Sequence, residues 1–298
     1  MKEKLVASTN TPPQGKLKKI ITSPKNRVVS GIMYLFLFIW AAIQIFPLYW
    51  LFAFSLKDNT EIFAGNVVGL PTKWLWANYT KALVNGHVAK YFINSVIVTG
   101  TTIFITVVVS LMATYALTRM VFKIKKPMNT FYMIGLTVPI HSALLPVFVM
   151  LRSFKMVNSY WALILPYVAF AIPMAVMIFS GFIASIPIDL EEAACLDGCN
   201  IYQVFFEIIV PLMKPAAATV AIFTFLQAWN ELMFAVVFIS DAKYRTLTVG
   251  IQALSGQYTI DWGAIGAGLV VATIPTLIVY IFMSKKVQDS LVVGAVKG

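Results

Sequence analysis

Side chains that could do chemistry are concentrated in one polar stretch, EEAACLDGCNIYQVFFEIIVPLMKP, which spans Glu191–Pro215. This stretch holds four acids and both cysteines of the chain, Cys195 and Cys199. A zinc site would need further cysteine or histidine ligands near them, and the two histidines, His87 and His141, lie far away in the sequence. We therefore predict two reduced thiols on the cytoplasmic side, with no metal site and no disulfide.

The rest of the chain lacks the residues of an energy-converting centre. No phosphate-binding loop is present, because Gly15-Lys16 is followed by Leu17 rather than by Ser or Thr. The long apolar segments contain no paired carboxylates, arginine series or histidine ladder, which a proton pump, voltage sensor or haem carrier would need. We predict no catalytic residue and no cofactor, and uphill transport would have to draw its energy from another chain.

The composition of the whole chain indicates the class of protein to which the polar stretch belongs. Of the 298 residues, 59% are hydrophobic and only 12% are charged, and the mean hydropathy is +0.82. A soluble domain carries about 25% charged residues, so this composition predicts an integral membrane protein. The net charge of +11 does not indicate nucleic-acid binding, because the basic residues fall between apolar runs rather than on one polar face.

Six apolar stretches are long enough to cross a bilayer, which takes roughly 20 helical residues. None contains Lys or Arg, which argues against buried helices of a soluble protein, and the short alternating strands of a β-barrel are absent from the sequence. We therefore predict an all-α polytopic membrane protein with six transmembrane helices. The predicted spans are Gly31–Ser55, Tyr91–Thr118, Pro127–Leu151, Tyr160–Phe182, Ala216–Ser240 and Trp262–Ser284.

The distribution of Lys and Arg predicts the orientation of these spans. With the N-terminus inside, 15 of the 23 basic residues fall in cytoplasmic segments, as the positive-inside rule requires. This places both termini and the polar stretch in the cytoplasm. The predicted divisions are an N-terminal tail over 1–30, a membrane domain over 31–284 with a cytoplasmic loop at 183–215, and a C-terminal tail over 285–298.

The first half of the polar stretch reads as a short helix. Pro187 suits the first turn, and the acids that follow it would lie near the positive end of the helix dipole. Residues at helical spacing predict one apolar face. That face would consist of Ile186, Leu190, Ala193 and Ala194.

The second half reads as a turn and a second helix. Gly198 suits a sharp helix stop because glycine adopts a left-handed backbone cheaply. Asn200 can cap the next helix, with Gln203 as its reciprocal partner three residues later. We predict this helix over Ile201–Ile209, ended by Pro211. Two short helices joined at a glycine form a surface suited to docking on a soluble partner.

This pattern resembles the EAA loop of ABC-importer permeases, which is Glu-Ala-Ala, three residues, Gly, nine residues, Ile, one residue and Leu-Pro. Here the corresponding residues are Glu192-Ala193-Ala194, Gly198, Ile208 and Val210-Pro211. The spacing holds throughout, and Val in place of Leu is a conservative change. The segments Gln227–Glu231, Thr137–Pro139 and Gly294–Gly298 are also similar to segments of the maltose-type sugar permeases.

The resemblance implies a type I ABC-importer permease fold in the cell membrane of a bacterium or archaeon. Such a subunit forms half of the pathway for a sugar or oligosaccharide. The implied partners are a second permease, usually a different chain, an ATPase dimer that hydrolyses the ATP, and an extracytoplasmic solute-binding protein. In that branch the C-terminal tail can reach the ATPase, which assigns this contact to Gly294 and Lys297. The implied coupling residues are Glu192, Ala193, Ala194, Asp197, Gly198 and Pro211.

Glu231 is the single acid within the predicted spans, and an acid inside a membrane should face a cavity or a partner. With Trp229 and Asn230 it could meet sugar hydroxyls in the substrate pathway. It could instead form hydrogen bonds within the permease pair or to the binding protein. Three other readings stay open: a permease for a non-sugar solute, a secondary carrier, or a membrane scaffold without a pathway.

Overall fold

Four long helices organise the part of the chain that the structure, a computed structural model, describes: residues 24–255 and 260–295. Each is long and apolar enough to cross a membrane, and they match the first, second, fourth and sixth predicted spans. Within these ranges the remaining backbone forms shorter helices or irregular segments, apart from one isolated bridge between Ser255 and Ile260. The long helices are α2 (Pro24–Ser55), α5 (Val88–Arg119), α8 (Trp161–Ile183) and α15 (Trp262–Ala295).

The third predicted span, Pro127–Leu151, is not one straight helix but a bent pair of helices. The chain forms α6 (Lys125–Gly135), a 3-10 segment η2 (Ile140–Ala143) and α7 (Leu144–Ser153), with a bend of 99° between the two halves. Pro139 precedes η2 directly. A proline disfavours helical backbone at the residue before it and cannot donate a helix hydrogen bond, so the break falls where the sequence places it.

The fifth predicted span, Ala216–Ser240, is also interrupted. The helix α12 (Lys214–Trp229) ends well before Ser240, and the chain restarts as α13 (Met233–Phe238) and α14 (Leu247–Ala253). A bend of 70° separates α12 from the helical segments that precede it. The described residues therefore provide four spans, or up to six if each bent pair is counted as one.

The helix α5 lies at the centre of the bundle and packs against α8 and α12. Its packed face carries a row of small hydroxylated residues, which let neighbouring helix backbones approach closely. Ser110 and Thr114 satisfy their hydroxyls by donating to backbone carbonyls of the preceding turn. The buried row consists of Ser95, Thr99, Thr102, Thr106, Ser110 and Thr114.

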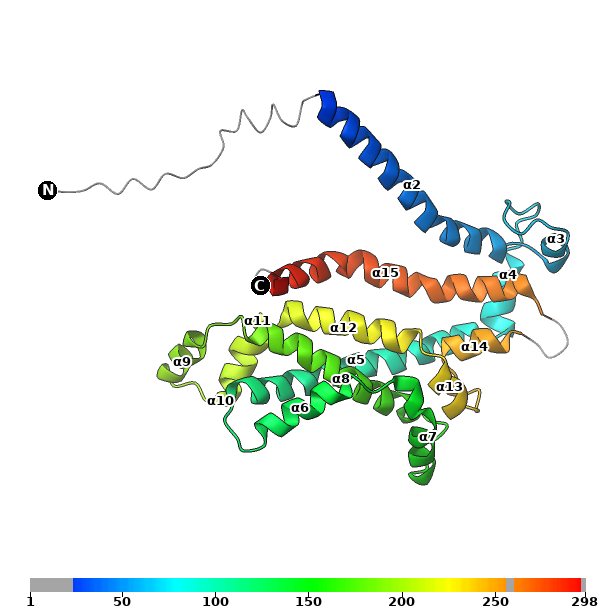
Figure 1. The fold of residues 1–298 in the computed structure, drawn as a ribbon. Helices are drawn as coiled ribbons and strands as arrows, with labels where there is room; N and C mark the ends of the chain where they lie inside the picture. The colour runs from blue at the N-terminus through cyan, green and yellow to red at the C-terminus, as the bar shows by residue number, and fades with distance from the viewer. Residues whose placement is uncertain (1–23, 256–259, 296–298) are drawn as a thin grey trace.

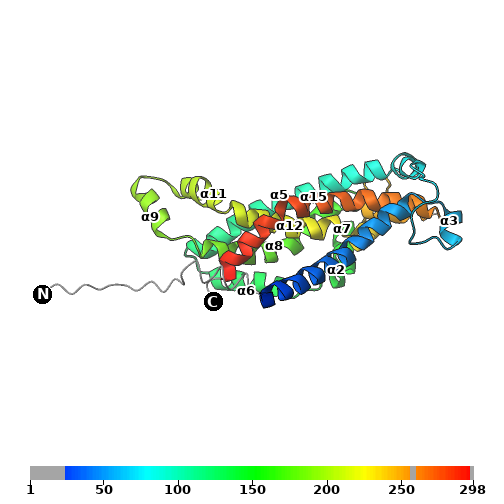
Figure 2. The ribbon, with the colours of Figure 1, turned by 90° about the horizontal axis from the view of Figure 1, so that it is seen from above.

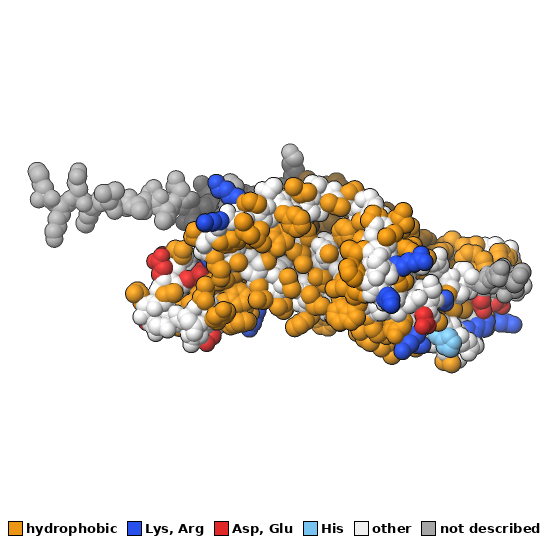
Figure 3. Space-filling view, turned by 90° about the horizontal axis from the view of Figure 1, so that it is seen from below, with side chains coloured by type: hydrophobic (Ala, Val, Ile, Leu, Met, Phe, Trp, Pro, Cys, Tyr) orange, Lys and Arg blue, Asp and Glu red, His pale blue; other side chains and the backbone are white. Residues whose placement is uncertain are grey.

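The helix α2 diverges from the other helices (Figures 1 and 2) and packs against α15. Its side chains from 28 to 49 are all exposed in the single chain. A hydrophobic surface covers the middle of the face in Figure 3, and charged side chains gather toward its two ends. This distribution suits a protein whose waist lies in lipid and whose ends lie in water.

The connection between α2 and α5 is folded rather than extended. It contains α3 (Asn59–Phe63), α4 (Ala77–Thr80) and the π-helical segment η1 (Lys81–Asn85). Lys57 is fully buried at its start, and its Nζ donates to the carbonyl oxygen of Asn66 at 2.7 Å. Burial lowers the pKa of Lys57, and the nearby carboxylate of Glu61 opposes that shift.

Candidate functional site: the 183–215 loop

The loop over residues 183–215 projects from one end of the helix bundle (Figures 1 and 2). After α8 it forms α9 (Asp189–Leu196) and returns through α10 (Ile201–Gln203), the π-helical segment η3 (Val204–Ile209) and α11 (Val210–Leu212). Its inner side chains join α5, α8 and α12 in one apolar cluster, so the loop is a packed part of the fold. The buried loop members of this cluster are Ala194, Val204, Phe205, Ile209 and Met213.

The buried face of α9 differs from the predicted apolar face. Leu190 and Ala193 are exposed, whereas the acid Glu191 is buried together with Ala194. The predicted apolar face was therefore wrong at Leu190 and Ala193, whereas Ala194 is buried in the apolar cluster and Ile186 packs against it. Hydrophobic spacing failed here because Glu191 has polar partners inside the protein, which compensate for the loss of its hydration.

Those partners come from the end of α5. The Nε of Arg119 lies 2.6 Å from Oε1 of Glu191, and the two side chains are only 16% and 10% exposed. The hydroxyl of Tyr115 donates to Oε2 of Glu191 at 3.1 Å. Arg119 also donates through Nη2 to the carbonyl oxygens of Ile183 at 3.2 Å and Ile186 at 2.7 Å. The last turn of α5 thus holds both the start of the loop and the first turn of α9.

The turn that follows α9 was predicted correctly from the sequence. Gly198 has a φ of +88°, in the left-handed region that favours glycine. The side chain of Asn200 accepts from the backbone N–H groups of Tyr202 and Gln203, and the Gln203 side chain accepts from the N–H of Asn200. This reciprocal cap fixes the direction in which the second helical segment leaves the turn.

The second helical segment does not end where the sequence predicted. Pro211 lies inside α11, which continues to Leu212, so the predicted end at Pro211 was wrong. The preceding segment, η3, is π-helical. Proline is tolerated in the first turn of a helix, where its missing N–H would have no helical partner, and the wide π turn allows α11 to start there.

The outer surface of the loop combines charge with exposed apolar groups. Of the residues predicted to couple to an ATPase, Glu192, Ala193, Asp197, Gly198 and Pro211 are exposed, and Ala194 lies beneath them in the core. Leu196 is 90% exposed and Tyr202 is 72% exposed. Beside α9 lies a hollow of about 490 Å³, lined by the Arg119–Glu191 pair and by Ile188, Glu192, Cys195 and Leu196.

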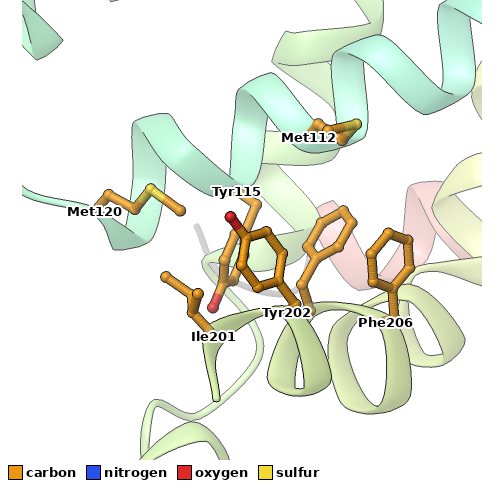
Figure 4. Close-up of a pocket in the computed structure, with 7 residues that line it drawn as sticks. Met112, Tyr115, Met120, Ile201, Tyr202 and Phe206 are labelled. Atoms are coloured by element: carbon orange, nitrogen blue, oxygen red, sulfur yellow. The ribbon is translucent and has the colours of Figure 1, made fainter.

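A second, more apolar pocket lies between the end of α5 and the returning segment (Figure 4). Its volume is about 360 Å³. Met112 and Met120 approach it from α5, and the rings of Tyr202 and Phe206 approach it from the loop. Because Tyr115 both lines this pocket and holds Glu191, the pocket and the hollow beside α9 share one support.

The three residues predicted to line a substrate pathway face different environments. The Nε1 of Trp229 donates to the carbonyl oxygen of Ala272 at 3.1 Å, and its ring is buried. Glu231 is also buried and accepts from the hydroxyl of Tyr167 at 2.6 Å and from the N–H of Phe234 at 2.8 Å. Both side chains therefore hold the fold together inside this chain. Asn230 alone is exposed and lines a cavity.

Glu231 also explains how α13 starts. Its carboxylate accepts from the first N–H groups of that helix, at Phe234 and at Ala235 (3.2 Å). A negative group is stabilised there by the helix dipole. The sequence indicated that this acid needed a partner, but it did not indicate that the partner would be the backbone of its own chain.

Two predicted contacts lie at the C-terminal end. Gly294 belongs to the last turn of α15, which makes the backbone of residues 285–295 helical. Lys297 lies outside the described residues. No group of three or more Asp, Glu, His or Cys suited to a metal ion occurs in the described part of the chain, and Cys195 and Cys199 are free thiols.

Sequence reasoning missed the role of Arg119, Tyr115 and Glu191. The sequence led us to interpret Arg119 only as one of the basic residues on the cytoplasmic side. Glu191 was interpreted only as an acid stabilised by the helix dipole. Glu191 and Glu192 are adjacent acids, and nothing in their immediate sequence distinguishes the buried one from the exposed one. A signal lay in the position of Arg119, the last residue of α5, which follows the uncharged stretch Tyr91–Thr118 directly, where a cation must find an anion or water.

Comparison with known proteins identifies the class of this protein. Residues 106–291, more than half of the chain, match the family "Binding-protein-dependent transport system inner membrane component". The chain belongs to this family and is the permease subunit of an ABC importer, a multi-pass protein of the cell membrane.

Individual relatives cover nearly the whole chain. The diacetylchitobiose uptake system permease protein NgcG of Streptomyces coelicolor is 34% identical, over 90% of this chain and 89% of its own length. The trehalose/maltose transport system permease protein MalG of Thermococcus litoralis is 33% identical, over 87% of this chain and 93% of its own.

A solved structure shares the fold. It is a chain of a bacterial ABC transporter involved in the import of the acidic polysaccharide alginate. The TM-score is 0.75 at 21% identity, and the match covers 88% of this chain and 98% of that chain.

Proposed function

We propose that this chain forms half of the transmembrane pathway of a sugar or oligosaccharide importer, and that its 183–215 loop couples the pathway to ATP hydrolysis on a separate ATPase dimer. The observation that carries the proposal is that α9 has one exposed face and one face held against a transmembrane helix. Glu192, Asp197 and Gly198 are exposed, while Glu191 on an adjacent face is tied to the transmembrane helix α5 through Arg119. A force applied to the outer face would be transmitted to a helix that crosses the membrane.

The assembly we propose has four kinds of chain. A second permease, a different chain, completes the pathway, two ATPase subunits bind the cytoplasmic loops, and a solute-binding protein docks on the opposite side. The exposed length of α2 offers apolar surface both to lipid and to the second permease. In this arrangement six spans cross the bilayer, and both termini and the 183–215 loop are cytoplasmic.

The proposed cycle is alternating access. ATP closes the ATPase dimer and draws the two coupling loops together, which opens the pathway outward to receive the solute. Hydrolysis and product release return it to the inward-facing state. Sugar is the favoured solute because relatives such as NgcG and MalG carry sugar names.

The coupling role is tested by the variant Gly198→Asp. At a φ of +88° the new side chain meets no atom within 4 Å and costs about 1–2 kcal/mol of backbone strain, but it places bulk and charge on the proposed docking surface. We expect the importer to assemble and hydrolyse ATP while sugar uptake per ATP falls at least tenfold.

Gly65 provides the matched control for that variant. It has a φ of +98° with equally open surroundings, but it lies in the connection between α2 and α5. Gly65→Asp should carry the same strain and leave the ratio of uptake to ATP hydrolysis unchanged. Normal uptake by Gly198→Asp, or equal uncoupling by both variants, would contradict the coupling assignment.

Importer and scaffold functions are separated by reconstitution. The chain, purified with its own ATPase, second permease and binding protein, should accumulate labelled oligosaccharide in proteoliposomes only when ATP is present. A complex that binds the ATPase stoichiometrically but moves no solute would support the scaffold reading.

A further inference from the structure

The break between α12 and α13 opens onto a cavity that the coupling loop does not involve. Its volume is about 530 Å³, within the range of about 300–1,000 Å³ typical of small-molecule sites. It lies between the end of α12, α14 and α15, which pack together at the end of the bundle opposite the 183–215 loop (Figure 1). Non-helical backbone at membrane depth is tolerated where it lines a cavity or is buried in protein.

The cavity is polar without being charged. Hydroxyl and amide side chains from three helical segments alternate with aliphatic ones, and none of the described residues that line the cavity is Lys, Arg, Asp or Glu. The nearest acid in sequence, Glu231, has its carboxylate engaged by Tyr167 and by the start of α13. The polar lining residues used below are Asn230, Thr248, Gln252, Thr273 and Thr276.

Some of these polar side chains already form hydrogen bonds within the protein, and others can still bond to a ligand. Thr273 donates to the carbonyl of Leu269 in its own helix, and Thr248 donates to the carbonyl of Glu231. Asn230 donates one Nδ2 hydrogen to the carbonyl of Leu226 at 2.9 Å, which leaves its second N–H and its Oδ1 for another partner. Gln252 is exposed, and its side chain makes no hydrogen bond within the described part of the chain, although its backbone carbonyl accepts from Ser255. It therefore presents a free donor and a free acceptor to the cavity.

We propose that this cavity is a subsite for an uncharged sugar on this chain's side of the transport pathway, with Gln252 and Asn230 as its hydrogen-bonding residues. The inference rests on the proposed importer function and names the solute class of the pathway. A carboxamide matches a sugar hydroxyl because it can donate and accept at once. A charged solute would be desolvated here without a counter-charge, which is costly.

The same cavity bears on the residues at the break between α12 and α13. The sequence left two readings open for Trp229, Asn230 and Glu231, contact with the solute or hydrogen bonds within the protein assembly. The side chains of Trp229 and Glu231 face the protein interior and are bonded there, so the solute-facing part of the break reduces to Asn230, and α14 supplies Gln252 across the cavity.

The test uses the complete importer in proteoliposomes, with its own ATPase, second permease and binding protein. Uptake of labelled maltose, trehalose and diacetylchitobiose is measured with ATP hydrolysis, at saturating sugar and binding protein. We expect Gln252→Leu, and more strongly Gln252→Leu with Asn230→Leu, to import roughly three- to tenfold less sugar per ATP, the effect of one lost hydrogen bond. Stimulation of the ATPase by the loaded binding protein should persist.

Thr273→Val serves as the control, because it changes a lining residue whose hydroxyl is already bonded within its helix; its uptake per ATP should equal that of the wild type. Wild-type sugar uptake per ATP in Gln252→Leu, in a complex whose wild type does import these sugars, would overturn the subsite alone. Import of an acidic disaccharide but of no neutral sugar by the wild type would overturn the proposal that the cavity binds an uncharged sugar. No sugar import at all by the wild type would reject the proposed function and this inference with it.

Discussion

The substitution Glu191→Gln isolates the contact between α5 and the coupling loop. Gln keeps the size of the side chain and can still accept from Tyr115, but it removes the negative charge that lies 2.6 Å from Nε of Arg119. Arg119 keeps its bonds to the carbonyls of Ile183 and Ile186. The substitution should therefore weaken only the interaction between α5 and α9.

The size of the effect follows from the burial of the pair. Both side chains are well under one-third exposed, so solvent screening is limited. Breaking a fully buried pair costs about 3–5 kcal/mol, and a hydrogen bond to a charged group contributes about 1.5–3 kcal/mol. Because Gln retains part of the bonding, we expect about 2 kcal/mol against docking of α9, which is a roughly 30-fold shift in its opening equilibrium.

Amide hydrogen exchange of the assembled importer measures that shift. Peptides covering Asp189–Leu196 should exchange roughly 30-fold faster in Glu191→Gln, and sugar uptake per ATP should fall in the same variant. Glu192→Gln is a matched control, because it makes the same change at the next residue, whose side chain is exposed. Equal protection of α9 in the two variants would refute the reasoning, because it would mean that the ion pair does not hold the helix.

Two further predictions concern other parts of the fold. Glu231→Gln should lower the unfolding free energy by about 2 kcal/mol, because it weakens the buried bonds from Tyr167 and from the start of α13; a thermal-unfolding assay should detect this, with uptake per assembled complex unchanged. At the start of α15, burial raises the pKa of Asp261, but the hydrogen bond from Lys81, 2.7 Å away, and backbone N–H groups outweigh it and hold that pKa below its ordinary value. A carboxyl whose folded pKa is depressed stabilises the fold above its unfolded pKa of about 4 and loses that contribution as the pH falls through the folded value. Hydrogen exchange at the start of α15 should therefore rise below about pH 4 in the wild type and be less sensitive to acid in Asp261→Asn.

The long spans were predictable because the length and apolarity of a segment are properties of its sequence and do not depend on how the helix packs. Four of the six predicted spans coincide with long helices. The bent helix pairs are also apolar enough to be taken as membrane spans, so hydropathy could not detect the breaks. At Pro139 a local steric rule would have placed the break. Between Trp229 and Met233 no proline or glycine is present, and the break depends on the tertiary partners of Glu231.

Local chemistry in the loop was predictable for a similar reason. The left-handed backbone of Gly198 and the reciprocal cap of Asn200 and Gln203 depend on neighbours within a few residues. The buried face of α9 depends instead on Arg119, which lies 72 positions before Glu191 in the sequence. A pattern read along one helix cannot include a partner on another helix, so an acid was assigned to solvent.

The adjacent acids of the Glu-Glu-Ala-Ala segment show why that distinction matters for coupling. Successive residues on an α-helix point about 100° apart, so Glu191 and Glu192 face different directions although both border the hollow beside α9. Glu191 binds Arg119 inside the protein, and Glu192 is left on the outer face beside the hollow of α9. A docking surface that was mobile against its own membrane helix would absorb a displacement rather than transmit it. The buried acid therefore makes the exposed surface mechanically useful, and the two residues serve one function from adjacent faces of the same helix.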